Sequence, residues 1–190
     1  MVGKWEINVT VGKLPERIAT GLSGLSIIGA EYEPIAYLGS QVVNGTNHAV
    51  LAEQVLTTGR DVRNIVLMIF NERDDAVTLS NIERVIESGG ELGGFNVDVK
   101  TEIPKEAMEA FDKAVDGLIG FKMNPFALLG TQAAGYAFAA EMIPATENPE
   151  KSAVLVEIDT LTKKVHITDI IEGRGRADGL GYAFTWLTRK

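Results

Sequence analysis

The residues best able to do chemistry in this sequence are two histidines and one pair of adjacent aspartates. His48 and His166 lie in different strand-like segments at unrelated positions, without paired carboxylates nearby. Cysteine is absent, so thiol nucleophiles, thiolate metal ligands and disulfides are excluded. Asp74 and Asp75 occupy a polar turn, which does not exclude water as acid–base chemistry by a carboxylate pair requires. The sequence therefore predicts no catalytic residue, no metal site and no cofactor, and a protein that is not an enzyme.

The bulk composition narrows the class of partner. The chain has 190 residues, 45% hydrophobic and 23% charged, which is typical of a globular protein. Its formal net charge of −8 disfavours a nucleic-acid partner, because binding to phosphates requires a basic surface. The basic residues near the C-terminus are interpreted as a solvated tail: Arg174, Arg176, Arg189 and Lys190.

The sequence also disfavours a membrane partner. No apolar run reaches the length of roughly 18 residues that spans a bilayer. The first residues, "MVGKWEINVTV", alternate as a strand does and contain no apolar core of a signal peptide. We therefore expect a cytoplasmic protein, although a leader removed earlier would leave the same sequence.

The most specific local pattern is "SQVVNGT", residues 40–46. Asn44-Gly45 strongly indicates a type I′ turn between two strands. The apolar residues Val42 and Val43 directly precede that turn. The stretch therefore predicts a tight hairpin, which serves either the fold alone or contact with another molecule.

The chain contains an internal repeat. "GAEYEPIAYLGSQVVNG" (29–45) aligns with "GFKMNPFALLGTQAAG" (120–135), so that Pro34, Gly39 and Gln41 match Pro125, Gly130 and Gln132 at one constant offset. Further matches flank this core: "WEINV" with "FNVDV", "VLMIFN" with "VLVEID" and "VTLSNI" with "VHITDI". We interpret the chain as a tandem duplication with domains at 1–88 and 94–190, the second with an extra C-terminal strand.

Each repeat predicts the same order of elements. A short strand precedes an amphipathic helix that begins at a proline, over about 14–28 in the first repeat and 103–119 in the second. Four strand-like runs follow. The predicted fold class is α+β, with two tandem units, each of one helix packed on a four- to five-stranded antiparallel sheet. The strand at 94–100 could belong to either sheet.

The stretch "YEPIAYLGSQVVNGTNHAV" resembles the central hairpin of the cystatins. In that family a Gln-x-Val-x-Gly loop is commonly followed by Thr-Asn and an aromatic residue. Gln41, Val43 and Gly45 stand at the motif positions, and His48 replaces the aromatic residue. The order of strand, helix and four strands is also the cystatin order. Gly3 resembles the N-terminal glycine of the family.

The resemblance implies an inhibitor of papain-like cysteine proteases that plugs the active-site cleft. Cystatins insert a wedge made of the N-terminal segment, the central hairpin and a second hairpin, and need no chemistry of their own. Carried over, the second hairpin would be 71–75. The protease-binding residues would be Gly3, Gln41, Val42, Val43, Asn44 and Gly45.

Two departures from the family keep an alternative open. The second hairpin reads Glu72-Arg73-Asp74-Asp75 where inhibitory cystatins usually present Pro-Trp or Leu-Pro. The second repeat reads "QAAG" (132–135), which is shorter and lacks the valines, so no inhibition is expected from it. The alternative is a non-enzymatic binding or structural protein that uses a duplicated cystatin-like scaffold. The sequence is also compatible with a homodimer.

Overall fold

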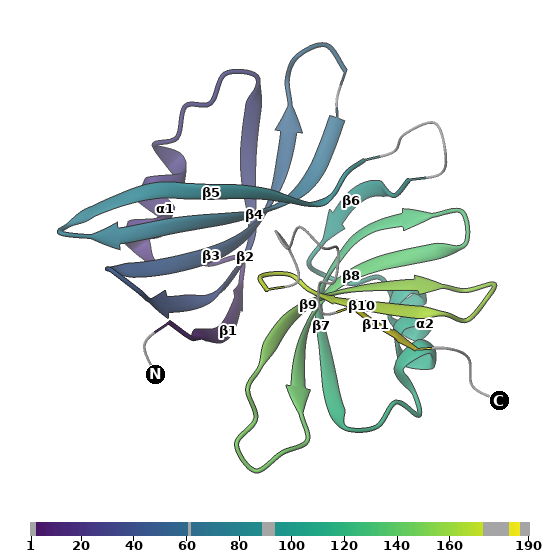
Figure 1. Ribbon diagram of the computed structural model, residues 1–190. Helices are drawn as coiled ribbons and strands as arrows, with labels where there is room; N and C mark the ends of the chain where they lie inside the picture. The colour runs from purple at the N-terminus through teal and green to yellow at the C-terminus, as the bar shows by residue number, and fades with distance from the viewer. Residues whose placement is uncertain (1–2, 61, 89–93, 173–182, 187–190) are drawn as a thin grey trace. The chain divides into compact units, whose positions relative to one another are not determined.

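The computed structural model describes residues 3–60, 62–88, 94–172 and 183–186 (Figure 1). The chain divides into two compact units, Met1–Ser88 and Gly89–Lys190. The basic C-terminal residues interpreted as a solvated tail lie outside the described residues.

The first unit is built on a five-stranded antiparallel sheet in the order β1-β2-β3-β4-β5. Its elements are β1 (Trp5–Val11), α1 (Glu16–Ser23), β2 (Ala30–Val42), β3 (Thr46–Leu56), β4 (Val62–Arg73) and β5 (Ala76–Ile86). Each strand from β2 onward pairs with its predecessor in the chain, so the sheet is a meander. In Figure 1 the start of β1 and the tips of the β2–β3 and β4–β5 hairpins lie at the same end of this unit.

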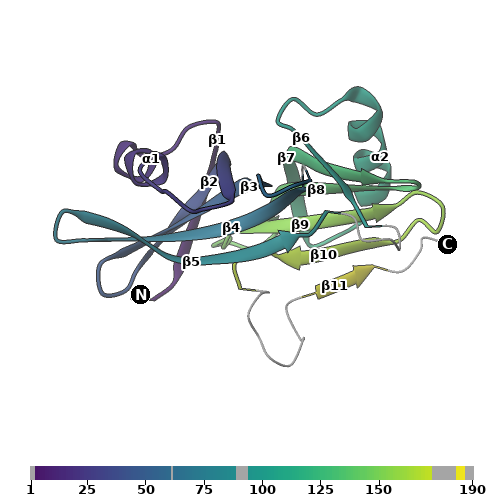
Figure 2. The same ribbon diagram turned by 90° about the horizontal axis from the view of Figure 1, so that it is seen from above.

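Helix α1 is short because its two ends are set by local sequence. Pro15 occupies the N-cap, where its missing N–H leaves no helical bond unmade. Gly24 caps the other end, and its N–H donates to the Thr20 carbonyl at 3.0 Å. The helix lies over one face of the sheet (Figure 2). Its two buried residues, Ile18 and Leu22, pack with strand residues of that face: Val50, Ala52, Val66, Met68 and Phe70.

The edge strand β5 is irregular. Its register with β4 shifts between 65 and 66 and again between 69 and 70. It also lies close to the helix, because a Cβ added to Gly21 of α1 would be 2.9 Å from Cγ1 of Val77. The glycine at that position therefore permits α1 to approach β5 closely.

The second unit holds a six-stranded antiparallel sheet in the order β11-β10-β9-β8-β7-β6. Its elements are β6 (Asn96–Lys100), α2 (Lys105–Val115), β7 (Phe121–Gln132), β8 (Gly135–Pro144), β9 (Ser152–Asp159), β10 (Val165–Asp169) and β11 (Ala183–Trp186). The segment 94–100, whose sheet the sequence left open, supplies β6, which pairs with β7. Strand β11 pairs with β10 and forms the opposite edge.

The predicted fold class is wrong. The described part of the chain is mostly β, with eleven strands against two helices of 8 and 11 residues, and one sheet has six strands rather than four or five. Both helices are shorter than the ranges expected from sequence. Among the buried hydrophobic residues described, only four come from helices: Ile18, Leu22, Ala107 and Phe111. Strand residues therefore supply most of the core, and each helix contributes two buried side chains. No helix within the described ranges is long and apolar enough to cross a lipid bilayer.

Two register shifts recur at matching places in the two units. The pairing of β2 with β3 shifts at 34–36 and at 37–39. The pairing of β7 with β8 shifts at 125–127 and at 128–130. These positions coincide when the repeats are aligned by their shared Pro and Gly residues. Bulges at fixed positions bend a strand and increase its twist, so the two sheets share the same local distortion.

A glycine ends the second shift in each unit because another strand lies against it. A Cβ added to Gly39 would be 2.2 Å from the carbonyl oxygen of Glu6 in β1. A Cβ added to Gly130 would be 2.5 Å from the carbonyl oxygen of Asn96 at the start of β6. Real Cβ atoms do not come that close to a backbone oxygen. Any other residue at either position would therefore push the first strand of its unit away.

Candidate functional site

The predicted hairpin between β2 and β3 is present, but its turn is one residue longer than expected. Val42 pairs with Thr46, so the loop is Val43-Asn44-Gly45 instead of a two-residue type I′ turn. Asn44 and Gly45 have φ of 45° and 99°, in the left-handed region that Asn and Gly adopt most readily. The N–H of Val43 donates to the Gly45 carbonyl at 3.1 Å and closes the loop.

The two valines at this tip face solvent. Val42 is 62% exposed and Val43 is 38% exposed. A single exposed valine is ordinary on a protein surface. Two adjacent valines on a hydrogen-bonded loop, however, form an apolar surface whose backbone loses little conformational entropy on binding.

Gly3 is tied to this hairpin by two hydrogen bonds. The Gly3 N–H donates to the Val42 carbonyl at 3.1 Å, and Nε2 of Gln41 donates to the Gly3 carbonyl at 2.7 Å. A Cβ added to Gly3 would be 3.8 Å from the Val43 side chain. The N-terminal segment therefore runs beside the apolar tip, and Gln41 holds it there.

A row of side-chain amides continues from Gln41 across three strands. Nδ2 of Asn47 donates to Oε1 of Gln41 at 3.0 Å, and Nδ2 of Asn71 donates to Oδ1 of Asn47 at 2.8 Å. The three residues are direct cross-strand neighbours on β2, β3 and β4. Cross-strand side-chain pairs of this kind stabilise a sheet locally. The row links the N-terminal segment and the first hairpin to the strand that leads into the second.

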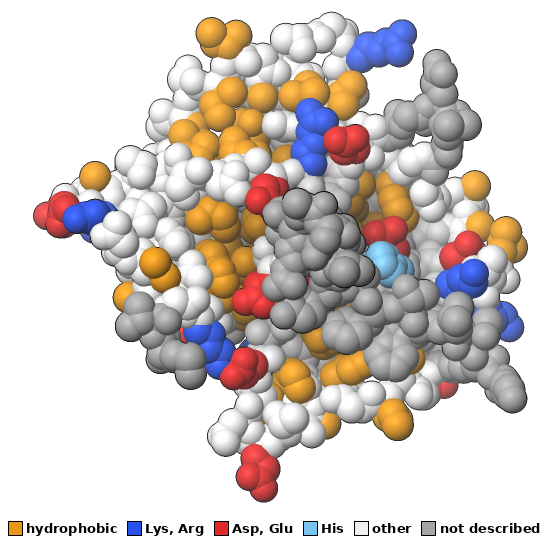
Figure 3. Space-filling view, in the orientation of Figure 1, with side chains coloured by type: hydrophobic (Ala, Val, Ile, Leu, Met, Phe, Trp, Pro, Cys, Tyr) orange, Lys and Arg blue, Asp and Glu red, His pale blue; other side chains and the backbone are white. Residues whose placement is uncertain are grey.

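The second hairpin, between β4 and β5, ends next to the first. Asp74 and Asp75 have φ of 50° and 63°, the two positive values that a type I′ turn requires. A Cβ added to Gly45 would be 2.6 Å from the Glu72 carbonyl oxygen, so the two hairpins touch through their backbones. Charged side chains gather at the tip of this hairpin, at the left of the view in Figure 3.

A polar chain supports the second hairpin from below. The Tyr37 hydroxyl lies 2.9 Å from Nδ1 of His48, and Nε2 of His48 lies 3.0 Å from Oε2 of Glu72. Arg17 of α1 forms an ion pair with Glu72 and lies 3.7 Å from Asp75. Burial raises the pKa of Tyr37, and the Glu72 carboxylate adds to that effect. The Tyr37 hydroxyl, the His48 ring and the Glu72 carboxylate therefore form one hydrogen-bonded chain beneath the second hairpin.

All the residues predicted as binding positions lie together at one end of the first unit: Gly3, Gln41, Val42, Val43, Asn44 and Gly45. Sequence reasoning missed Asn47 and Asn71, which complete the amide row, and Arg17, which reaches the second hairpin from α1. Their roles depend on cross-strand register and helix placement. The only sequence signal for Asn47 was its place in the Thr-Asn pair after the motif.

The corresponding end of the second unit is built differently. Gln132 pairs with Gly135, which leaves a two-residue turn of Ala133 and Ala134. The N–H and hydroxyl of Thr160 lie 2.8 Å and 2.9 Å from the Ala134 carbonyl, to which both donate. This tip presents methyl groups where the first unit presents valines.

The described residues contain no group of three or more His, Asp or Glu side chains that could hold a metal ion. No protein-family model matches the sequence, and no curated protein or solved structure matches it either. The function must therefore be argued from the geometry of this chain.

Proposed function

We propose that the first unit is a proteinaceous inhibitor of papain-like cysteine proteases, as the resemblance of its central hairpin to the cystatins implies. The wedge consists of Gly3, the loop from Gln41 to Gly45 and the adjoining turn at 71–75. The protein acts without chemistry of its own and so is not an enzyme. A cytoplasmic location, which suits a chain without cysteine, is part of the proposal.

One observation carries the proposal: three segments far apart in the sequence are bonded into one edge with an apolar centre. Gly3 is bonded to Gln41 and Val42, and the Gly45 backbone abuts Glu72. A rigid edge of this kind can enter a cleft with little ordering of its own. Val42 and Val43 supply the apolar area that such a cleft would bury.

The charged second hairpin favours a second candidate function. Glu72, Asp74 and Asp75 carry negative charges at the tip, and docking them in an apolar cleft would require their desolvation. Arg17 offsets part of this cost through its ion pair with Glu72. The alternative is that the same edge binds a polar or basic protein surface, or a second copy of this chain, and that the scaffold has no inhibitory role.

Titration of papain with the full chain tests the proposal. Wild-type protein is expected to abolish papain activity at micromolar concentration or tighter. Val42→Asp is expected to weaken inhibition by roughly a hundredfold, because a carboxylate would be buried without a partner. Gly45→Glu is a poorer test, since a side chain there would clash with the Glu72 backbone and deform the loop.

Ile28→Asp provides the matched control. Ile28 is fully exposed in the α1–β2 connection, ahead of the start of β2 and therefore at the far end of that strand from Val42. This variant should inhibit as the wild type does. Papain that keeps full activity in a large molar excess of the wild-type chain would exclude the inhibitor and leave the scaffold alternative.

A further inference from the structure

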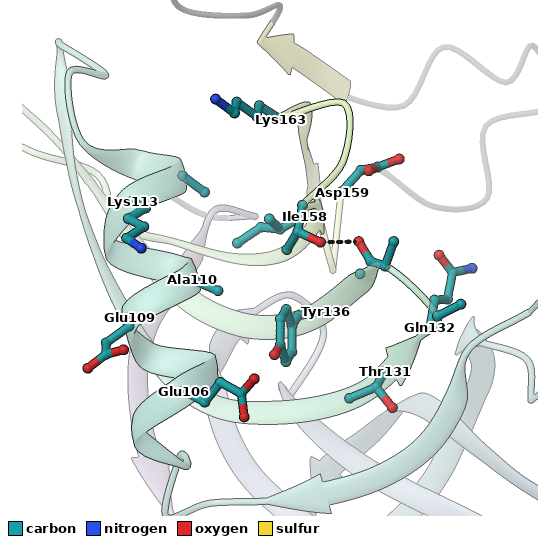
Figure 4. Close-up of a pocket in the computed structure, with 15 residues that line it drawn as sticks. Glu106, Glu109, Ala110, Lys113, Thr131, Gln132, Tyr136, Ile158, Asp159 and Lys163 are labelled. Atoms are coloured by element: carbon teal, nitrogen blue, oxygen red, sulfur yellow. Dashed lines mark hydrogen bonds between the residues drawn. The ribbon is translucent and has the colours of Figure 1, made fainter.

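A cavity of about 990 Å³ opens in the second unit between α2, the β7–β8 hairpin and the β9–β10 turn (Figure 4). The Tyr136 ring stands near its centre, with Glu106 on the helix side and Lys163 on the turn. None of its lining residues belongs to the wedge proposed for the first unit. An inference about this cavity is therefore independent of protease inhibition.

Strand register shows which residues occupy the same place in the first unit. Tyr136 lies opposite Ile158 as His48 lies opposite Phe70. The following pair is Asn47 with Asn71 in the first unit and Gly135 with Asp159 in the second. The next residue along the strand is then Glu72 in the first unit and Thr160 in the second. In the first unit that place is closed, because His48 and Glu72 are bonded to each other and covered by Arg17 from the helix.

The helices differ at two matching positions. Both begin after a proline, and their buried pairs, Ile18/Leu22 and Ala107/Phe111, have the same spacing. This alignment puts Glu106 in the place of Arg17 and Ala110 in the place of Gly21. The first change reverses the charge that closes the space in the first unit. The second adds a methyl group, which lines the cavity, where the first unit needs a bare backbone.

Several polar groups of the cavity have no protein partner among the described residues. Glu106, Lys113, Lys163 and the Tyr136 hydroxyl form no hydrogen bond or ion pair there. Asp159, by contrast, is occupied, because its carboxylate accepts the N–H groups of the next turn, those of 161 and 162, at 2.9 Å. Glu106, Lys113 and Lys163 are exposed to solvent, so charged groups of both signs are accessible to a ligand around one hollow.

The charges are separated along the cavity. Figure 4 shows the Glu106 carboxylate directed from α2 toward the side of Tyr136, whereas Glu109 points away and pairs with Lys105 at 3.9 Å. Lys113 and Lys163 stand toward the other end. A cation would meet a carboxylate and an aromatic ring at one end, and an anion would meet two ammonium groups at the other.

We propose that this cavity binds a zwitterion of the size of an amino acid, with a guanidinium or ammonium group at Glu106 and Tyr136 and a carboxylate at Lys113 and Lys163. The cationic group of the ligand would supply the positive charge that the Arg17 side chain supplies in the first unit. The small side chains of Ala133 and Ala134 leave the β7–β8 side of the cavity open to such a ligand.

NMR titration of the full chain with L-arginine tests the site. Saturable shift changes confined to α2, the β7–β8 hairpin and the β9–β10 turn are expected, with a Kd of about 1 mM or tighter. Agmatine, which lacks the carboxylate, should bind about tenfold more weakly. Glu106→Gln should weaken the binding of L-arginine by about tenfold or more. Lys163→Ala should remove most of the difference in affinity between L-arginine and agmatine.

Glu109→Gln is the matched control: Glu109 borders the cavity, but its carboxylate is directed away from Tyr136 and pairs with Lys105, so binding should be unchanged. The double variant Glu106→Arg, Thr160→Glu rebuilds the closed arrangement of the first unit and should abolish binding while keeping a folded spectrum. Absence of saturable shifts up to roughly 10 mM arginine would overturn the proposal. So would equal affinity in the wild type and Glu106→Gln.

Discussion

The same end of the two units has opposite character. In the first unit Arg17, Glu72 and His48 close the space under the hairpins, and the tip above carries two exposed valines. In the second unit Glu106 and Tyr136 border an open cavity, and the tip carries two alanines. The end of the first unit is filled by side chains and carries exposed valines. The end of the second unit is hollow and is lined by polar side chains.

This difference teaches that the strand framework and the end groups vary separately. The register shifts and the glycine that accommodates the first strand recur in both sheets. The residues that decide between a closed and an open end lie on the helix and at the strand ends. The two ends therefore differ in a few side chains while the hydrogen-bonded framework is retained.

The largest effect is expected where the frameworks agree. Gly39→Ala and Gly130→Ala should each lower the free energy of unfolding by about 3 kcal/mol or more, because the new methyl group would overlap a carbonyl oxygen of the first strand. Chemical denaturation measures the loss. Gly12→Ala is the control: its φ of 69° is left-handed but its surroundings are open, so it should cost only about 1–2 kcal/mol. Equal losses at Gly12 and Gly39 would contradict the close approach.

A smaller effect on stability is expected when a tyrosine at the end of each unit is replaced by phenylalanine. Tyr37→Phe removes the hydroxyl bonded to His48, a residue only 9% exposed, and leaves Nδ1 without its hydrogen-bond partner. The expected loss is about 1–2 kcal/mol. Tyr136→Phe removes a hydroxyl that bonds to no described residue and should cost less than about 0.5 kcal/mol. Thermal or chemical unfolding of both variants checks the contrast, and similar losses would show that the two ends are equally bonded.

The smallest effect concerns two aspartates of the second unit that form the same turn. Each accepts two backbone N–H groups, Asp159 from 161 and 162 and Asp169 from 171 and 172. The bond from Thr162 holds the pKa of Asp159 below its usual value, whereas burial raises the pKa of Asp169. Stability from Asp159 is therefore present above its unfolded pKa and lost as the pH falls through the folded value. For Asp169, stability is fullest below the unfolded pKa and declines as the pH rises through the folded value.

Denaturation at pH 4 and pH 7 measures this contrast. The stability of Asp169→Asn relative to the wild type should improve between pH 4 and pH 7, and that of Asp159→Asn should worsen. The asparagine side chain keeps an oxygen that can accept the same N–H groups, so the turn itself is retained. Parallel pH profiles for the two variants would contradict opposite shifts.

Local and repeated signals were the part of the fold that the sequence could predict. Asn44-Gly45 indicated the hairpin, Pro15 and Pro104 marked the helix starts, and the aligned glycines marked the shared framework. The sequence did not predict the fold class, because periodicity shows where helices and strands occur but not how much core each supplies. It also missed the third loop residue, since that depends on the pairing of Val42 with Thr46.

The candidate sites divide in the same way. The loop residues of the first unit were predictable because they form a contiguous motif. The amide row of Asn47 and Asn71 required the register of three strands. The cavity required the combined positions of Glu106, Tyr136 and Thr160, which come from three elements and carry no recognisable motif. Sites assembled by long-range contacts are invisible to local pattern reading.

The irregular pairing of β5 bears on how two molecules could join. An edge strand offers unpaired backbone groups to a neighbouring chain, and long flat edges are those that polymerise. Two register shifts within eleven residues break the even spacing of those groups and twist the strand. Growth of a continuous intermolecular sheet from β5 is thereby disfavoured, so self-association at this edge of the first sheet would have to use side-chain contacts rather than backbone pairing.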